Sequence, residues 1–325
     1  MKSITKLIAV VVVVAIIASG LGIYSYEHTV SNDKVSSHPI TVTDSLGRTF
    51  TFNHTVTRIV SIDPAATATL YALGAYKYLV GGNEFDCYPP NESLPNTGNA
   101  FGINYEEIVN LSPQVVLYYG DAMNKYTDYV NNTLHIPVLV DNPENFQEIE
   151  NFTLMLGTLT GTEKNASIIT EWMNESLSAI NNATSNITNR LSAFYYLCYF
   201  GGYYTVGNDT FIGKIMYYAH LRNIATNPCY YDMPAEDIVN DSPQVIILDQ
   251  YVNYSAVEQE PFNSTPAFQD GMIFHVPNDN FMDEPDFRTI YSVEWLVNQV
   301  YPFALLSIPK FPLSLQYPPT YGFRA

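Results

Sequence analysis

A thirteen-residue segment occurs twice in this chain and constrains the fold more than any other feature. Residues 106–118 read Glu-Glu-Ile-Val-Asn-Leu-Ser-Pro-Gln-Val-Val-Leu-Tyr, and residues 236–248 read Glu-Asp-Ile-Val-Asn-Asp-Ser-Pro-Gln-Val-Ile-Ile-Leu, with eight positions identical at an offset of 130. Each copy predicts a short helix that ends at Ser-Pro, because proline disfavours the α conformation in the preceding residue. The apolar run after it is typical of a parallel strand covered on both faces. The repeat therefore predicts two similar α/β lobes.

The 325 residues are enough for two lobes, each with its own mostly parallel central sheet. Between the lobes, apolar residues recur at helical spacing and predict one long helix, or two in line, that crosses from one lobe to the other. The tail is rich in proline and is expected to be irregular. The predicted boundaries are 40–143 for the N-terminal lobe, 144–191 for the linking helix, 192–308 for the C-terminal lobe and 309–325 for the tail.

The N-terminus predicts export. Lys2 and Lys6 precede an uncharged stretch of 18 residues, which is the lower limit for a membrane span. We interpret residues 1–25 as a membrane anchor and residues 26–39 as a tether, with the bulk of the chain on the extracellular side. A signal that is cleaved near Ser19, releasing the protein, is the alternative. No cysteine follows the stretch, which argues against a lipid anchor.

The charge of the chain excludes one class of partner. There are 14 Lys and Arg against 32 Asp and Glu, a net charge of −18, whereas nucleic-acid binding needs a basic face. Thirteen Asn-x-Ser/Thr sequons fit an exported glycoprotein. Of the three cysteines, Cys198 lies in an apolar run and is expected in the core. Cys87 and Cys229 fall in loops of different halves, where a disulfide would tie the lobes together.

Catalytic and metal-binding constellations are missing from the sequence. The six histidines are scattered, and there is no HExxH, GxSxG, P-loop or Cys/His metal spacing. We therefore expect neither an enzyme nor a metal centre, and no cofactor apart from iron or cobalt within a ligand.

Aromatic loops are the best candidates for a binding site. In open α/β sheets, ligands bind at the carboxyl ends of the strands, where several aromatic loops are expected. Two lobes that present such loops to each other form a cleft for a large, partly aromatic ligand. The candidates are Phe85, Tyr88 and Phe101 in the first lobe and Tyr203, Tyr204, Tyr230 and Tyr231 in the second.

Two acidic residues lead the repeated helices. Glu106 and Glu236 fall in a first helical turn, where the helix dipole alone stabilises an acid. Equivalent exposed acids on two lobes would also suit contacts with basic residues of a partner.

Together these segments resemble the iron-siderophore and vitamin B12 class of solute-binding proteins of ABC importers. The resemblance runs from about residue 40 to 302 and depends on the repeated Glu-x-Ile-x-x-x-x-Pro-x-Val and on four further segments. These are Thr41–Arg48, Arg58–Pro64, Leu70–Ala75 and Gly207–Phe211. The resemblance implies two Rossmann-like lobes joined by a rigid backbone helix, with the ligand between them. It also implies that Glu106 and Glu236 dock onto the permease, and it places pocket positions near Phe85, Phe101, Tyr204 and Tyr230.

The resemblance implies a receptor that delivers a ferric siderophore, haem or cobalamin to an ABC permease and its ATPase. We expect a monomer that contacts the membrane through its N-terminal segment. Anionic siderophores need basic groups, for which Arg288 is the candidate, whereas a tyrosine-lined cleft suits cobalamin or a hydroxamate chelate. A free zinc- or manganese-binding protein and an exported enzyme on the same scaffold are the alternatives.

Overall fold

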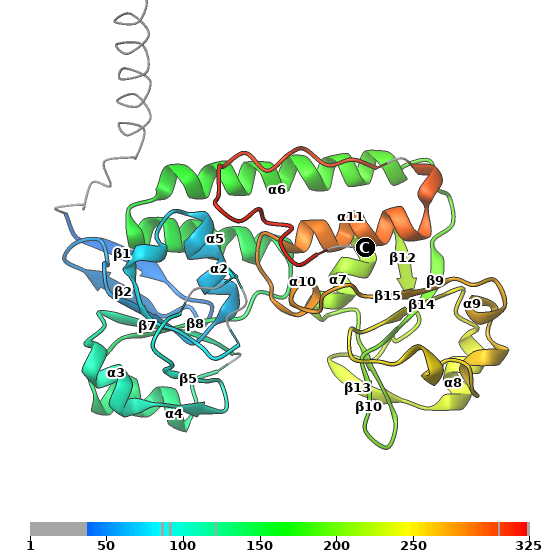
Figure 1. The fold of residues 1–325 in the computed structure, drawn as a ribbon, viewed down its shortest axis with the longest axis horizontal. Helices are drawn as coiled ribbons and strands as arrows, with labels where there is room; N and C mark the ends of the chain where they lie inside the picture. The colour runs from blue at the N-terminus through cyan, green and yellow to red at the C-terminus, as the bar shows by residue number, and fades with distance from the viewer. Residues whose placement is uncertain (1–37, 86–87, 91–92, 121, 305, 324–325) are drawn as a thin grey trace, which may run out of the picture. The chain divides into compact units, whose positions relative to one another are not determined.

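The computed structural model describes residues 38–85, 88–90, 93–120, 122–304 and 306–323 (Figure 1). The predicted anchor, nearly all of the tether and Cys87, with its proposed disulfide, lie outside the described residues. Among the helices that are described, none is both long enough and apolar enough to cross a membrane.

Two four-stranded parallel sheets with the same strand order form the centres of two lobes. The N-terminal sheet has the order β4 (Leu79–Gly81), β3 (Ile59–Ser61), β7 (Val115–Tyr119) and β8 (Val138–Asp141). The C-terminal sheet has the order β12 (Leu221–Asn223), β9 (Leu191–Tyr196), β14 (Val245–Leu248) and β15 (Ile273–His275). The repeated strands β7 and β14 occupy the same position, which confirms the predicted α/β fold class.

The two copies of the repeat have the same backbone. Helix α3 (Tyr105–Leu111) and helix α8 (Ala235–Asp241) each end at the serine before proline. Ser112 and Ser242 are left-handed, both with φ of 46°, rather than extended as the proline alone would favour. The backbone N–H of each serine is shared between two carbonyls of the last helical turn, and the left-handed conformation allows these hydrogen bonds.

Shorter elements surround the sheets. In the N-terminal lobe, strands β1 (Ile40–Thr43) and β2 (Thr49–Phe52) form an antiparallel hairpin, and β5 (Gly98–Asn99) pairs with β6 (Gly102–Ile103). The helices of this lobe are α2 (Pro64–Ala72), η1 (Tyr76–Tyr78), α4 (Lys125–Asp128), η2 (Tyr129–Thr133) and α5 (Phe146–Thr160). Helix α6 (Glu163–Thr184) leads to the C-terminal lobe. Besides its central sheet and α8, this lobe contains strands β10 (Cys198–Tyr199), β11 (Tyr203–Val206) and β13 (Tyr230–Met233). Its remaining helices are α7 (Phe211–Tyr218), η3 (Tyr254–Ala256), η4 (Phe262–Ser264), α9 (Pro266–Gln269), α10 (Asn280–Asp283), α11 (Thr289–Val300) and η5 (Pro302–Ala304).

One hydrophobic core joins the two lobes. In β7, Val115 and Leu117 face this shared core, whereas Val116 packs in a second cluster on the other face. The same alternation holds in β14, where Val245 and Ile247 face the shared core. Because the shared core continues through α5, α6 and α11, the lobes are coupled by buried apolar contacts.

The linking segment differs from the prediction. Instead of one helix or two in line, α5 and α6 fold back and pack side by side (Figure 1). The chain reverses at Gly161, which ends α5 in a left-handed conformation with φ of 74°. Gly157 allows this packing, since a Cβ there would lie 2.6 Å from the Cβ of Ala166. Helix α6 extends from the N-terminal lobe to α7 and α11 of the other lobe, and Phe146 at the start of α5 also packs against Phe211 and Tyr218 of α7.

The apolar run that contains Cys198 is divided between two sheets. Strand β9 ends at Tyr196, and the chain then forms a separate antiparallel sheet of β10, β11 and β13. Cys198 is therefore exposed, and the expectation that it belongs to the core is wrong. An apolar run cannot by itself reveal where a strand leaves the buried sheet.

The tail is irregular, as predicted, but it is packed against both lobes. The Nε1 of Trp172 in α6 donates to the carbonyl of Pro309 at 2.8 Å. Further along, the backbone N–H of Tyr317 donates to the hydroxyl of Tyr71 in α2, at 3.0 Å. Phe323 then stacks on Phe281 of α10, with ring centroids 4.4 Å apart. The tail therefore connects the C-terminal lobe to the N-terminal lobe.

Candidate functional site

A cavity of 640 Å³ opens between the two lobes. Residues from both lobes line it, and we call it the inter-lobe cavity. The N-terminal lobe contributes Ile62, Asp63, Pro64, Ala65, Asn83, Glu84, Phe85, Asn99, Ala100, Phe101 and Tyr119. The C-terminal lobe contributes Tyr251, Asp279, Asn280, Asp283, Glu284 and Pro285.

The N-terminal wall is built at the carboxyl ends of parallel strands. Asp63 follows β3, Asn83 follows β4, and Tyr119 is the last residue of β7. Asp63 is buried, and its Oδ1 accepts the backbone N–H of Ala65 at 2.9 Å, which caps α2. The site therefore lies at the edge of the sheet where α/β proteins bind ligands.

Two asparagines shape the loops that carry the aromatic rings. The Oδ1 of Asn83 accepts the backbone N–H of Phe85, and the Oδ1 of Asn99 accepts that of Phe101, each at 2.8 Å. These bonds to the residue two positions further on are Asx turns. The Asn99 side chain also donates to Glu84, which ties the two loops together. These hydrogen bonds fix the backbone of Phe85 and of Phe101, while the two residues remain 55% and 85% exposed.

The C-terminal wall follows β14 and β15. Tyr251 lies three residues beyond β14, and its hydroxyl donates to Asp279. The backbone N–H of Asp279 in turn donates to the Oε1 of Gln250 at 2.8 Å. Asp283 ends the short helix α10 and faces the cavity.

The cavity changes the ionisation of the groups around it. Burial, with smaller contributions from Tyr230 and Glu144, raises the pKa of Tyr119 well above its usual value. Burial also raises the pKa of Tyr230, and the next contribution comes from Asp283. Both hydroxyls therefore remain protonated at neutral pH, and Tyr230, unlike Tyr119, does not line the cavity.

The structure separates the predicted aromatic residues of the first lobe. Phe85 and Phe101 line the cavity, but Tyr88 does not. Tyr88 is buried, packs edge-on against Tyr71 with centroids 5.1 Å apart, and donates its hydroxyl to the carbonyl of Tyr317 at 2.8 Å. Its contacts are those of a core residue that holds the tail.

The predicted aromatic residues of the second lobe lie mostly away from the cavity. Tyr203 packs edge-on against Phe262, with centroids 5.1 Å apart, and half-buried Tyr231 lies near the backbone N–H of Asn227. Tyr204 lies in the antiparallel sheet opposite Cys198. None of these three lines the inter-lobe cavity, because the strands that carry them belong to the small sheet rather than the central one.

Arg288 does not face the ligand site. Its side chain is buried, and its Nε donates to the Oδ2 of Asp286 at 2.8 Å. A second ion pair joins it to Glu284, and its guanidinium stacks over the ring of Tyr88 at 4.9 Å. The expectation that Arg288 binds an anionic ligand conflicts with this arrangement, since its side chain is buried and its Nε and Nη2 donate to carboxylates inside the protein.

Sequence reasoning missed several residues of the cavity. Tyr119 and Tyr251 follow the two copies of the repeat, and Asp63 lies just beyond β3. Their position after a parallel strand was the available signal. The acidic segment from Asp279 to Glu284 had no such signal, because its place depends on how α10 packs against α11.

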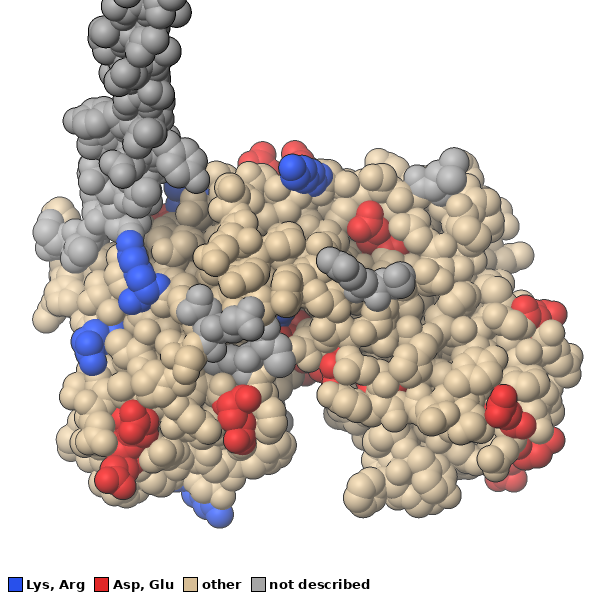
Figure 2. Space-filling model, in the orientation of Figure 1, with Lys and Arg blue, Asp and Glu red and all other residues tan. Residues whose placement is uncertain are grey.

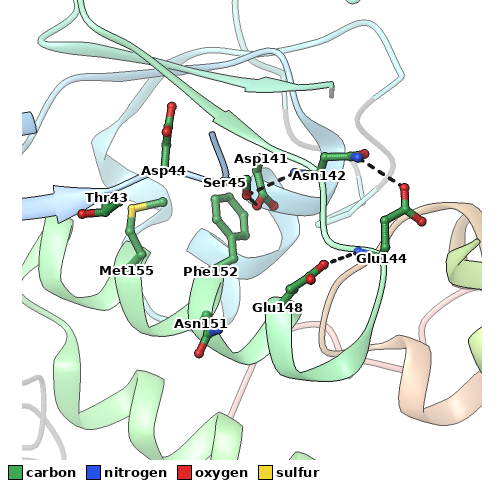
Figure 3. A pocket seen from close by; sticks show the side chains of 10 residues that line it. All are labelled: Thr43, Asp44, Ser45, Asp141, Asn142, Glu144, Glu148, Asn151, Phe152 and Met155. Carbon is green, nitrogen blue, oxygen red and sulfur yellow. Dashed lines mark hydrogen bonds between the residues drawn. The ribbon is translucent and has the colours of Figure 1, made fainter. Parts of the chain in front are cut away.

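A second cavity, of 470 Å³, lies within the N-terminal lobe beside α5 (Figure 3). Hydrogen bonds link several of its polar groups: Ser45 donates to Asp141 at 2.8 Å, and the backbone N–H of Glu144 donates to Glu148 at 2.7 Å. The Oε2 of Glu144 also accepts the backbone N–H of Phe211, at the start of α7, at 3.1 Å. This cluster therefore joins the N-terminal lobe to a helix of the C-terminal lobe.

Glu106 and Glu236 are both exposed and occupy the second position of α3 and α8. Neither lines the inter-lobe cavity. In Figure 1, α3 and α8 both lie on the side of their lobe that faces away from α6. Asn104 caps α3, and its Oδ1 accepts the backbone N–H of Glu107 at 3.2 Å.

The histidines of the C-terminal lobe are used structurally. The Nε2 of His220 lies 2.8 Å from the carbonyl of Ile187, and that of His275 lies 3.0 Å from the carbonyl of Val252. Among the residues that the structure describes, neither ring is hydrogen-bonded to a serine or aspartate as a catalytic base would be. In the described part of the chain, no group of three or more His, Cys, Asp and Glu side chains is arranged to hold a metal ion.

Comparison with known proteins identifies the family. The model of the periplasmic binding protein family, of the iron, siderophore and B12 type, matches residues 59–280 of this chain. The chain belongs to this family. Its members are binding components of transporters rather than enzymes, in agreement with the expectation from the sequence.

Individual relatives resemble the chain over most of its length. An uncharacterised ABC transporter substrate-binding lipoprotein of Bacillus subtilis, YvrC, is 26% identical over 84% of this chain and 88% of its own. A cobalamin-binding protein of Halobacterium salinarum is 25% identical over 82% of this chain and 75% of its own. The apo structure of the periplasmic haem-binding protein RhuT from Roseiflexus shares the fold, with a TM-score of 0.68, 20% identity, and coverage of 77% of this chain and 99% of that one.

Proposed function

We propose that this protein is the substrate-binding component of an ABC importer, and that it captures a corrinoid or a ferric chelate in the inter-lobe cavity. The observation that carries the proposal is the cavity itself, which is lined by aromatic side chains from both lobes at the carboxyl ends of their strands. Its volume lies in the ordinary range for small-molecule sites.

The relatives support this class of ligand. One is named as a cobalamin-binding protein and another, of the same fold, as a haem-binding protein. Both names describe flat macrocycles that hold a metal, which exposed aromatic rings such as those of Phe85 and Phe101 bind by stacking. The iron or cobalt would thus arrive within the ligand.

The two repeated helices supply the proposed contact with the permease. Glu106 and Glu236 are exposed, equivalent by the repeat, and carried by helices on the same side of the two lobes in Figure 1. Basic residues of a permease would be attracted to both at once. We place the protein on the outer face of the cell membrane, held there by its N-terminal segment.

The test is direct binding. Purified protein is titrated calorimetrically with cyanocobalamin, haem, a ferric hydroxamate and a ferric catecholate. We expect micromolar or tighter binding, at one molecule of ligand per chain, for at least one of them. The failure of all four to bind would refute the proposed class of ligand. Binding that is unchanged when Phe85 and Phe101 are both replaced by alanine would refute the proposed site.

A further inference from the structure

The inter-lobe cavity is acidic on both walls. Five carboxylates line it, and none of the described residues that line it is Lys or Arg. In Figure 2, acidic side chains are spread over both lobes, and basic ones lie mainly on the N-terminal lobe. The five acids are Asp63, Glu84, Asp279, Asp283 and Glu284.

Four of these carboxylates are engaged by the protein. Asp63 caps α2, and Glu84 accepts the side chain of Asn99. Glu284 is paired with a buried arginine, and Asp279 accepts the hydroxyl of Tyr251. These contacts fix where the charges lie.

Asp283 is different from the other four. No described residue donates a hydrogen bond to its carboxylate, although the side chain is open to the cavity. Burial, followed by the charges of Asp249 and Asp279, raises its pKa to about 7. A carboxylate that lies near two other carboxylates, without a hydrogen-bond donor or a cation of its own, is costly to ionise. It is therefore a group whose charge a ligand can compensate.

Aromatic rings face the same space. Phe101 and Phe85 extend from the N-terminal wall, and Tyr251, which is 79% exposed, extends from the C-terminal wall. The faces of aromatic rings attract cations, and this attraction strengthens when water is excluded. The carboxylates and the aromatic rings of this cavity therefore both favour a positively charged ligand.

We propose that the ligand carries a positive charge, and that this charge binds beside the Asp283 carboxylate among the aromatic rings of the inter-lobe cavity. This inference rests on the proposed function, since it specifies the charge of the ligand at that same site. Anionic chelates, which would meet five carboxylates, are disfavoured.

A matched pair of ligands provides the test. Ferrioxamine B carries a terminal ammonium group, and its N-acetylated form has the same iron centre without that charge. Aquacobalamin, which is cationic while the water on its cobalt is protonated, and neutral cyanocobalamin form a second pair. We expect the cationic member of at least one pair to bind about tenfold more tightly, at pH 8 for the ferrioxamine pair and at pH 7 for the cobalamin pair. We expect this preference to disappear in Asp283→Asn and to persist in Asp270→Asn, an exposed acid outside the cavity.

The pH dependence gives a second readout. The affinity for ferrioxamine B should rise between pH 5.5 and pH 8, whereas the affinity for its N-acetylated form should change little. The groups that surround Asp283 are Asp249, Asp279, Tyr195 and Tyr230, and the two tyrosines stay protonated over this range. The double variant Asp249→Asn, Asp279→Asn should move the rise to lower pH, because the like charges that oppose ionisation of Asp283 are removed.

The outcomes separate the two proposals. Tight binding of both members of a pair with equal affinity, or a preference that survives in Asp283→Asn, would overturn the inference about charge and leave the proposed function intact. If no probe of either pair and no anionic chelate binds, the proposed function is wrong and this inference fails with it.

Discussion

Phe101 offers the sharpest test of the binding site. Its side chain is 85% exposed in the free protein, while its backbone is fixed by the hydrogen bond to Asn99. Replacing it with alanine removes a ring that the ligand would cover without disturbing the loop. Because few protein contacts are lost, the free energy of unfolding should change by no more than about 0.5 kcal/mol.

The expected effect on binding follows from the area that the ligand would bury. Complete burial of a phenylalanine side chain contributes about 1.5–3 kcal/mol. Starting from 85% exposure, nearly all of this gain is available on binding. We therefore expect Phe101→Ala to weaken binding by about 2 kcal/mol, or about 30-fold in Kd.

Calorimetric titration of the wild type and the variant with the best ligand measures this effect directly. Phe303→Ala is the matched control, because Phe303 is 71% exposed and does not line the cavity. It should leave Kd unchanged. Equal affinity of the wild type and Phe101→Ala would show that the ligand does not cover this ring, and the inter-lobe site would have to be abandoned.

Three further predictions concern docking, stability and pH. Reversing Glu106 and Glu236 together to arginine should abolish uptake in cells and preserve ligand binding, whereas the same reversal one residue further along each helix should leave uptake measurable; a loss of binding would refute the docking role. Tyr195→Phe should lower the free energy of unfolding in urea by about 2 kcal/mol at pH 8, because the buried hydroxyl donates to Asp249 at 3.0 Å; an unchanged midpoint would contradict that bond. The folded-state pKa of Asp283 is raised from 3.8 to about 7, so stability should fall as pH rises between these values. Asp283→Asn should remove this fall and exceed the wild type in urea midpoint at pH 8, and a midpoint below the wild type there would contradict the sign.

The sequence predicted the sheets better than it predicted the site. The repeat gave the position of β7 and β14, because a buried parallel strand needs a continuous apolar run. The turn at Gly161 was less clear, since a glycine in an apolar periodic segment is compatible with a kink as well as with a reversal.

The site depended on information that the local sequence does not contain. Tyr88 and Phe85 are close in the chain, yet one holds the tail and the other faces the cavity. That difference arises from contacts with residues more than two hundred positions away, such as Tyr317. Arg288 likewise received its partners from the turn before α11, where Glu284 and Asp286 neutralise it.

The packed tail determines what tryptophan fluorescence reports in this protein. The chain has two tryptophans, and both contact the tail: Trp172 through Pro309 and Phe311, and Trp295 through Phe323. Neither lines the inter-lobe cavity. Their emission is thus an optical probe of tail attachment, remote from the cavity, and a change in it on adding a ligand would indicate a rearrangement behind α6 and α11.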